Sequence, residues 1–335
     1  MKDSSRAPTL LSRRYTSATI DLSLNPGEIL FALHLLCQSG GIEIAEFVTT
    51  SRDQPEWGPE LATKILPTLV SHLPNVHHFM LVNISTRFQW TLMEAAKNQL
   101  TTLELHSSPF VSWSYTVPRV KLERLNTLRL LENVAATAAP FLTRVVLCID
   151  APNVEALSIC NCLSDDPIPV REALRYFSPR LRTLGLLHDQ RPDLNVPFQH
   201  DPLPLLPNVV HLELEASWAP LYVGATSDTM ASLQSLAFQA LPEQVMGGLR
   251  VVDWHGLRLA WEQVRQPVRT IEWSCRSGEA LPPDSLLSIV KENFDAVGLV
   301  LPDNVQLCEG FRTPLPIPPA FDDDHLASRA WGTHE

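Results

Sequence analysis

Residues 100–105 read Leu-Thr-Thr-Leu-Glu-Leu, in which apolar residues stand at the first, fourth and sixth positions and polar residues fill the others. The same phrase, with mostly polar residues in between, returns along much of the chain and is often introduced by Pro-Asn. Its eight copies begin at Val76, Leu100, Leu125, Val154, Leu181, Val209, Leu233 and Val268. One six-residue match carries little weight because short apolar patterns are common, but eight copies in register indicate a repeated structural unit.

The spacing of the copies identifies the type of repeat. From Phe79 to Leu236 the middle apolar residues lie roughly 24 to 29 positions apart, as in leucine-rich repeats. Two copies extend to the longer form of that motif and end in Asn133 and Cys162. The sequence therefore predicts an α/β fold, a leucine-rich-repeat solenoid with a curved parallel sheet on the concave face and helices or coil on the convex face.

Composition and charge narrow the function classes. A formal net charge of -11 argues against binding to phosphate backbones, so we expect no nucleic-acid partner. No segment approaches the about 18 consecutive apolar residues of a membrane span, and the first residues do not form a secretion signal. Six cysteines spread over 335 residues are typical of reduced thiols, so we expect a cytoplasmic or nuclear protein without membrane contact.

Strand and helix patterns alternate along the chain. Residues 18–24 predict the first strand, because apolar residues alternate there and Asn25-Pro26-Gly27 then breaks the pattern. Residues 42–50 predict the second strand. Helices are expected between strands, at residues 28–38, 60–72, 90–99, 170–177 and 284–294. The long proline-containing connections 107–121 and 188–208 predict irregular coil on the outer face.

Between residues 238 and 268 the period falters. Leu249, Val252 and Trp254 form a half-step copy there, which predicts either a degenerate repeat or an inserted strand. Val297 and Leu299 predict a last strand. We expect three regions: a disordered N-terminus over 1–17, the solenoid over 18–300, and a disordered, proline-rich acidic tail over 301–335.

Side chains alternate along a strand, so the residues between the repeated leucines should face outward and line up across the stacked repeats. The expected central column reads Met80, Glu104, Arg129, Ser158, Gly185, Glu213, Ala237 and Glu272. We expect a protein partner to bind this concave face, at Glu104, His106, Arg129, Leu131, Leu187, His211, Glu213, Glu215, Gln239 and Glu272. Its glutamates favour a basic partner, and its two leucines, if exposed, could anchor an interface.

No catalytic, cofactor or metal residues are predicted. Nucleophile-elbow, phosphate-loop, dinucleotide and zinc-protease motifs are all missing from the sequence. Cys160 and Cys162 have no second pair at metal-binding spacing, so packing is the favoured reading. Two alternatives to a binding scaffold remain, a hydrolase using the loop pair His188-Asp189 or His200-Asp201, and a structural protein that self-associates through its edges.

The order of the elements carries a resemblance. A strand Ala-Thr-Ile-Asp-Leu at 18–22, a helix ending in Cys-Gln-Ser-Gly-Gly at 37–41 and a strand Ile-Glu-Ile at 42–44 precede a further helix, Leu-Pro-Asn-Val at 73–76 and Ala-Pro-Asn-Val-Glu-Ala-Leu-Ser-Ile at 151–159. Over about residues 15–300, this resembles the fungal F-box proteins with degenerate leucine-rich repeats.

In that family the F-box is a three-helix module that docks on the Skp subunit of a cullin-RING ubiquitin ligase, and the repeats hold the substrate. The resemblance therefore implies the substrate-recognition part of an SCF-type ligase. Residues 24–30 are similar to the opening of an F-box, but the Trp-bearing helix that follows in the motif is missing. We therefore expect docking on Skp only in a form that carries an F-box.

Overall fold

The computed structural model describes residues 17–22, 29, 42–48, 64–71, 73–82, 84, 86–107, 119–132, 145, 148–160, 168–187, 203–275 and 285–309. Eleven strands form one open, entirely parallel sheet, and they pair in the order in which they occur along the chain. They are β1 (Ser17–Asp21), β2 (Ile44–Val48), β3 (His78–Val82), β4 (Thr102–Ser107), β6 (Thr127–Glu132), β8 (Ala156–Cys160), β9 (Thr183–Leu187), β10 (His211–Glu215), β11 (Ser235–Ala240), β12 (Thr270–Cys275) and β13 (Gln306–Glu309). This confirms the predicted α/β class and the large parallel sheet.

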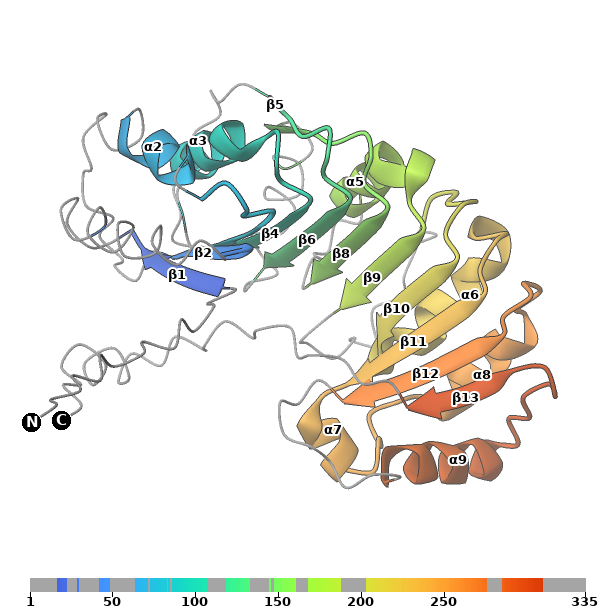
Figure 1. Cartoon of the computed structure of the whole chain (residues 1–335). Helices are drawn as coiled ribbons and strands as arrows, with labels where there is room; N and C mark the ends of the chain where they lie inside the picture. Colours follow the sequence, from blue (N-terminus) through green and yellow to red (C-terminus); the bar gives the residue numbers. More distant parts are fainter. Residues whose placement is uncertain are drawn as a thin grey trace, which may run out of the picture.

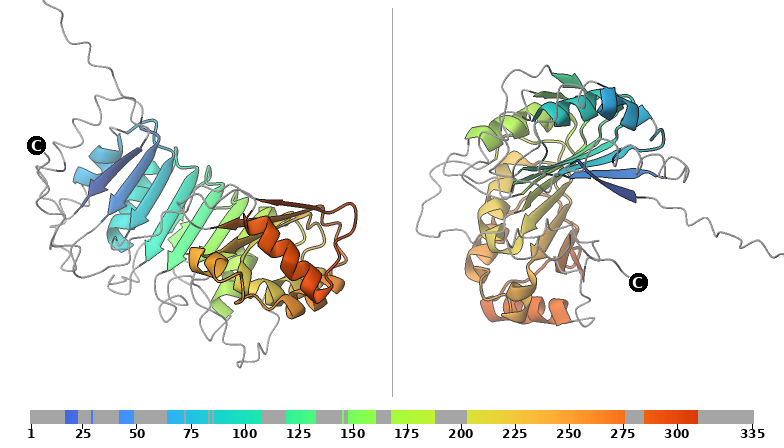
Figure 2. Two further views of the ribbon diagram at one scale, coloured as in Figure 1. Left: turned by 90° about the horizontal axis from the view of Figure 1, so that it is seen from below. Right: turned by 90° about the vertical axis from the view of Figure 1, so that its left-hand side faces the viewer.

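The sheet is curved, and most of the helices lie along its outer side (Figures 1 and 2). The helices are α2 (Leu66–Ser71), α3 (Thr86–Ala96), α5 (Ile168–Phe177), α6 (Ala219–Thr229), α7 (Pro242–Met246), α8 (Trp254–Glu262) and α9 (Ser285–Val297). Four of them overlap the predicted helices at 60–72, 90–99, 170–177 and 284–294. The predicted helix at 28–38 lies outside the described residues apart from Ile29. Among the described helices, none has the length and apolar character needed to cross a membrane.

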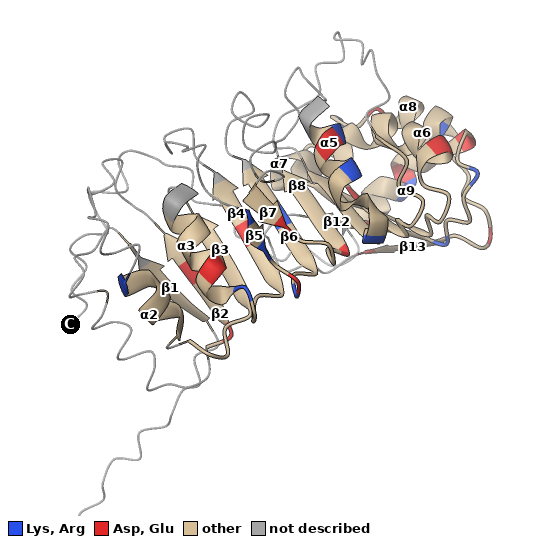
Figure 3. Cartoon of the chain, turned by 90° about the horizontal axis from the view of Figure 1, so that it is seen from above, with Lys and Arg blue, Asp and Glu red and all other residues tan. Residues whose placement is uncertain are grey.

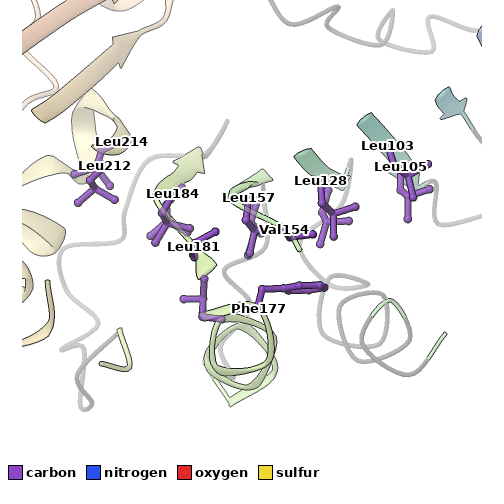
Figure 4. Close-up of a cluster of buried hydrophobic side chains, with 14 of the residues drawn as sticks. Leu103, Leu105, Leu128, Val154, Leu157, Phe177, Leu181, Leu184, Leu212 and Leu214 are labelled. Carbon is purple, nitrogen blue, oxygen red and sulfur yellow. The ribbon is translucent and has the colours of Figure 1, made fainter. Parts of the chain in front are cut away.

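The repeated leucines fill the space between the sheet and the outer helices. Leu103, Leu128, Leu157 and Leu184 point to the same side of the sheet, toward Phe177 of α5 (Figure 4). All four leucines are fully buried in one continuous apolar core that runs the length of the array. Each such leucine stabilises the fold by roughly 2 kcal/mol because its side chain leaves water. The repeated six-residue phrase therefore accounts for the residues of the core as well as for the positions of the strands.

The Pro-Asn pairs that introduce several strands also have a structural role. Asn153 Nδ2 donates to the carbonyl oxygen of Glu123, at 2.6 Å, and Asn208 Nδ2 donates to that of Pro179, at 3.1 Å. Each amide thereby ties its own turn to the turn of the preceding unit. These bonds satisfy backbone carbonyls at the edge of the layer, where the sheet ladder has ended.

A small second sheet lies on the convex side of the molecule (Figure 1). It pairs β5 (Val120–Lys121), at the end of the connection 107–121 that was predicted as coil, with β7 (Ile149–Asp150). Tyr176 of α5 lies beside it, with its hydroxyl 3.3 Å from Asp150 Oδ1 and the Arg119 guanidinium 4.9 Å from its ring centroid. Most of the two predicted coil segments, 108–118 and 188–202, lies outside the described residues.

The half-step phrase between β11 and β12 is not a strand, and β11 pairs directly with β12. α7 ends in a left-handed turn, with φ +69° at Gly248 and +56° at Leu249. The amide of Leu249 donates to Gln244 O and that of Gly248 to Val245 O, which is the Schellman pattern that ends a helix. The pattern Leu249-x-x-Val252-x-Trp254 therefore describes a helix end, a turn and the start of α8.

Aromatic packing explains why this region keeps three apolar residues at strand-like spacing. Trp254 at the start of α8 stacks on Trp273 of β12, with ring centroids 5.3 Å apart. Phe238 of β11 and Phe294 of α9 contact the same pair at 4.9 and 5.7 Å. The segment between β11 and β12 thus contributes side chains to the core and adds no strand to the sheet.

The predicted last strand at Val297 and Leu299 is also wrong. Val297 ends α9, and Gly298 follows in the left-handed region with φ +68°. The last strand in the described part of the chain is β13 (Gln306–Glu309), which pairs with β12. The sheet therefore continues beyond residue 301, into the stretch that the sequence assigned to the tail.

Candidate protein-binding face

The strand register brings the predicted outward residues into aligned columns. Met80 lies opposite Glu104, Glu104 opposite Arg129, and Arg129 opposite Ser158. The same column continues through Gly185, Glu213, Ala237 and Glu272. This is the column expected from the repeat period, residue for residue, and it extends to Glu46 on one side and Cys308 on the other.

The exposure of the predicted residues differs from the expectation. All ten lie on strands of the large sheet, but seven of them are buried: Glu104, His106, Leu131, Leu187, Glu213, Glu215 and Gln239. Arg129, His211 and Glu272 are half-buried. Charged residues are sparse along the strands and more frequent on the helices and turns (Figure 3). The face therefore holds its polar groups mainly in contact with one another.

The two leucines expected as exposed anchors are buried. Leu131 and Leu187 are 4% and 1% exposed, and with Cys160 they form an apolar cluster separate from the main core. The three residues come from β6, β8 and β9, so they occupy one stretch of the column next to the central one. Their side chains stabilise this stretch of the sheet and are not available as exposed interface anchors.

The first polar group on this face is the Glu104 cluster, formed by His78, Glu104, His106 and Arg129. Arg129 donates through one terminal nitrogen to Glu104 Oε1 at 2.8 Å, and His78 Nε2 lies 2.9 Å from the same oxygen. The side chains of Glu104, His78 and Arg129 are 2%, 19% and 36% exposed. A buried carboxylate is thus held by two partly exposed basic groups on the neighbouring strands.

These contacts set the charge state of Glu104. Burial raises the pKa of a carboxyl group because it penalises the ionised form. The neighbouring rings of His106 and His78 and the positive charge of Arg129 outweigh burial and hold the pKa of Glu104 far below its usual range. Glu104 is therefore ionised at neutral pH, and its charge is matched by that of Arg129.

His106 is the least satisfied member of the cluster. Its Nε2 lies 3.7 Å from Glu104 Oε2, beyond hydrogen-bonding distance, and its side chain is 2% exposed. Neither ring nitrogen, nor Glu104 Oε2, has a hydrogen-bond partner in the described part of the chain. Buried polar atoms without a partner cost free energy, so this corner of the face can accept a polar group or a water.

The second polar group is the Glu215 cluster, formed by Glu213, Glu215, Ser217, Gln239 and Gln244. Gln239 Nε2 donates to Glu213 Oε1, and the Ser217 hydroxyl donates to Glu215 Oε2. Gln244 of α7 donates to Glu215 Oε1 at 2.7 Å and accepts from the Leu241 amide at 2.9 Å. The two glutamates expected to form an exposed acidic patch therefore lie inside, because neutral amide and hydroxyl donors surround them.

Sequence reasoning missed part of both clusters. His78 is not among the predicted site residues, although it lies on β3 beside Glu104. Ser217 and Gln244 follow the strands, in a 3-10 turn and in α7, where the repeat period no longer assigns a side chain to a face. No signal in the repeat phrase marks these two residues.

The described residues offer little for a hydrolase or for a metal site. His188, Asp189, His200 and Asp201, the candidates for a hydrolase, lie outside them. No disulfide joins the described cysteines Cys148, Cys160, Cys275 and Cys308, and Cys162 lies outside the described residues. Within the described ranges, no group of three or more histidine, cysteine, aspartate or glutamate side chains is arranged to hold a metal ion.

Comparison with known proteins adds no relative: no protein-family model matches the chain, and no curated protein matches it either.

Proposed function

We propose that the chain is a non-enzymatic protein-binding scaffold, a leucine-rich-repeat solenoid whose concave strand face holds a partner protein. The observation that carries the proposal is the aligned central column from Thr19 to Cys308, unbroken across ten successive strand pairings of the parallel sheet. Such a column runs the length of a curved parallel sheet, and curved parallel arrays use their concave faces to bind extended partners.

The chemistry of the face supports binding over catalysis. Its buried carboxylates are engaged by fixed donors within the Glu104 and Glu215 clusters. One serine-histidine contact occurs on the face, between His211 Nδ1 and Ser235 Oγ at 3.0 Å. Both residues belong to the column at the start of the strands, and the repeat places Thr183 and Thr270 in the same register. The contact between His211 and Ser235 is therefore part of a row of polar side chains, and such a row can bind a partner without any catalytic role.

The partner class follows from the resemblance to fungal F-box proteins. We propose that the bound protein is a substrate for ubiquitin transfer and that the chain is the substrate-recognition part of an SCF-type ligase. A form carrying an F-box should capture the Skp subunit, whereas residues 1–335 alone should not. Capture by residues 1–335 would contradict the view that these residues lack the docking module.

Blocking substitutions test the proposed face. Ser158 lies half-buried in the middle of the central column, and Glu172 is exposed on α5, on the convex side. Proximity labelling in cells should identify proteins that the unchanged chain labels, that Ser158→Arg loses, and that Glu172→Arg retains. Ala156→Arg, on the same strand and face, is a second blocking variant. Equal labelling by all four proteins would remove the concave face from consideration.

A further inference from the structure

Arg129 occupies an unusual place on the concave face. It is the only arginine or lysine among the residues of the eleven strands of the large sheet. It lies in the central column, between Glu104 and Ser158, on a chain whose formal net charge is -11. Its side chain is 36% exposed, so the guanidinium is open to a partner.

The neighbours of Arg129 hold it in place without using all of its donors. One terminal nitrogen donates to Glu104 Oε1, which His78 also contacts from the other side. A guanidinium carries five N–H donors in a planar fork, and Glu104 is its partner among the described residues. The remaining donors can meet a carboxylate in the paired geometry that makes arginine–carboxylate contacts strong.

The neighbours of Arg129 on the side away from Glu104 are small. The next residues of the column are Ser158 and Gly185. The Ser158 side chain covers the buried Gly185, since a Cβ added there would come within 2.8 Å of the Ser158 hydroxyl, and Ser158 itself is half-buried. No bulky side chain of the column therefore stands next to the guanidinium on this side. On the other side, the buried His106 leaves both ring nitrogens without a partner in the described residues, next to Glu104.

From this arrangement we infer that the partner presents an aspartate or glutamate side chain to Arg129, and that this contact is the centre of the interface. The inference rests on the proposed function, because it assigns the chemistry of the same face. Glu104 and His78 are positioning residues: they fix the guanidinium, which lowers the entropy lost when the carboxylate binds. Arginine held in this way is common among residues that dominate interfaces.

Peptide selection tests the inference without a known partner. A random peptide library displayed on phage is selected on the immobilised full chain, and the affinity of each enriched peptide is measured by fluorescence anisotropy. We expect an aspartate or glutamate to be enriched at one position of the peptides. Replacing that residue by its amide should weaken binding to the unchanged chain by tenfold or more, a readout that needs no protein variant.

Three protein variants complete the cycle. Arg129→Gln should weaken binding of the acidic peptides by tenfold or more and should leave binding of the amide peptides unchanged. Arg129→Lys keeps the charge but loses the planar fork of donors, so it should weaken binding of the acidic peptides by a smaller factor. Arg182→Gln is the matched control, since Arg182 is exposed in the turn before β9. It should leave the affinity unchanged.

The outcomes separate this inference from the proposed function. Peptides that lose affinity on Ser158→Arg but bind Arg129→Gln normally would leave the concave face standing and overturn the role of Arg129. Enrichment of basic peptides in place of acidic ones would overturn it in the same way. Peptides insensitive to both substitutions, or no enrichment at all, would count against both the inference and the face.

Discussion

The Glu104 and Glu215 clusters both supply hydrogen bonds to buried glutamates, but they use different kinds of donor. Glu104 and Glu213 occupy equivalent positions in the central column, and both are buried. Glu104 is held by the cation of Arg129 and the ring of His78, which are partly exposed. Glu213 and Glu215 accept from the neutral groups of Gln239, Gln244 and Ser217, which are buried with them.

The difference shows how one repeat position can serve two purposes. An ion pair at the surface leaves a cation with unused donors facing solvent, so the Glu104 cluster is suited to contact a partner. A network of buried amide groups turns no charged donor toward solvent, but it ties β10 to α7 through Gln244 and β10 to β11 through Gln239. The Glu104 half of the face is therefore the part proposed to contact a partner, while the other half holds the irregular α7 segment in place.

The largest expected effect is in the Glu215 cluster. Gln244→Ala removes the donor to Glu215 and leaves a buried, hydrogen-bonded glutamate short of a partner, so we expect a loss of about 3 kcal/mol in the free energy of unfolding. Urea titration followed by tryptophan fluorescence measures it. Gln234, exposed in the turn before β11, provides the control Gln234→Ala. If the two variants were equally stable, Gln244 would have no role in holding α7.

A smaller loss in the free energy of unfolding is expected for Glu104→Ala. It removes the acceptor shared by Arg129 and His78, but both of these can turn toward water, so we expect about 2 kcal/mol. The exposed Glu155, in the turn before β8, gives the matched control Glu155→Ala, which should change stability by less than about 0.5 kcal/mol. A loss above that for Gln244→Ala would reverse the proposed contrast between the clusters.

The pH dependence of stability distinguishes an ion-paired carboxylate from a neutral one. The folded pKa of Glu104 is lowered, so its contribution is fully present above the ordinary glutamate value of 4.5 and is lost as the pH falls below it. At pH 5, Glu104→Gln should therefore be less stable than the unchanged chain by about 1 to 2 kcal/mol. Below pH 4.5 the difference should shrink. A difference that grows as the pH falls below 4.5 would mean that Glu104 is not held as the anion.

The smallest effect lies between the two clusters, at Gly185. An added methyl group would meet Ser158 Oγ at 2.8 Å, but a serine hydroxyl can rotate away. We expect Gly185→Ala to cost less than about 1 kcal/mol and the cost to vanish when Ser158→Ala is added. A double-mutant cycle by urea unfolding measures the coupling, and simple additivity would argue that the two residues are not neighbours.

The sequence predicts which residues share a column, because strand side chains alternate with a period of two and the phrase fixes the register. Glu104, Arg129 and Ser158 follow from that rule alone. The exposure of these residues does not follow from the rule, because it also depends on side chains that lie outside the repeated phrase. Gln244, for example, contacts Glu215 from helix α7, which is not part of the phrase. Counting along the phrase therefore places Glu215 on the right face but in the wrong environment.

Two segments show where the phrase itself misleads. Leu249-x-x-Val252-x-Trp254 has the right spacing, yet the left-handed pair Gly248 and Leu249 ends one helix and a second begins at Trp254. At the end of the chain, Val297 still belongs to α9 because Gly298 is what stops that helix. In both places a glycine with positive φ decides the structure, and apolar spacing alone does not reveal it.

Disulfide trapping tests the aligned column most directly. Paired residues on adjacent strands have Cα atoms about 5 Å apart, within the range of a disulfide bond. The double variant Ser158→Cys, Gly185→Cys should form an interstrand disulfide on mild oxidation, identified by peptide mass spectrometry. Ser158→Cys with Leu186→Cys, one residue further and on the opposite face, should not. Cross-linking of the second pair and not the first would contradict the register on which the concave face depends.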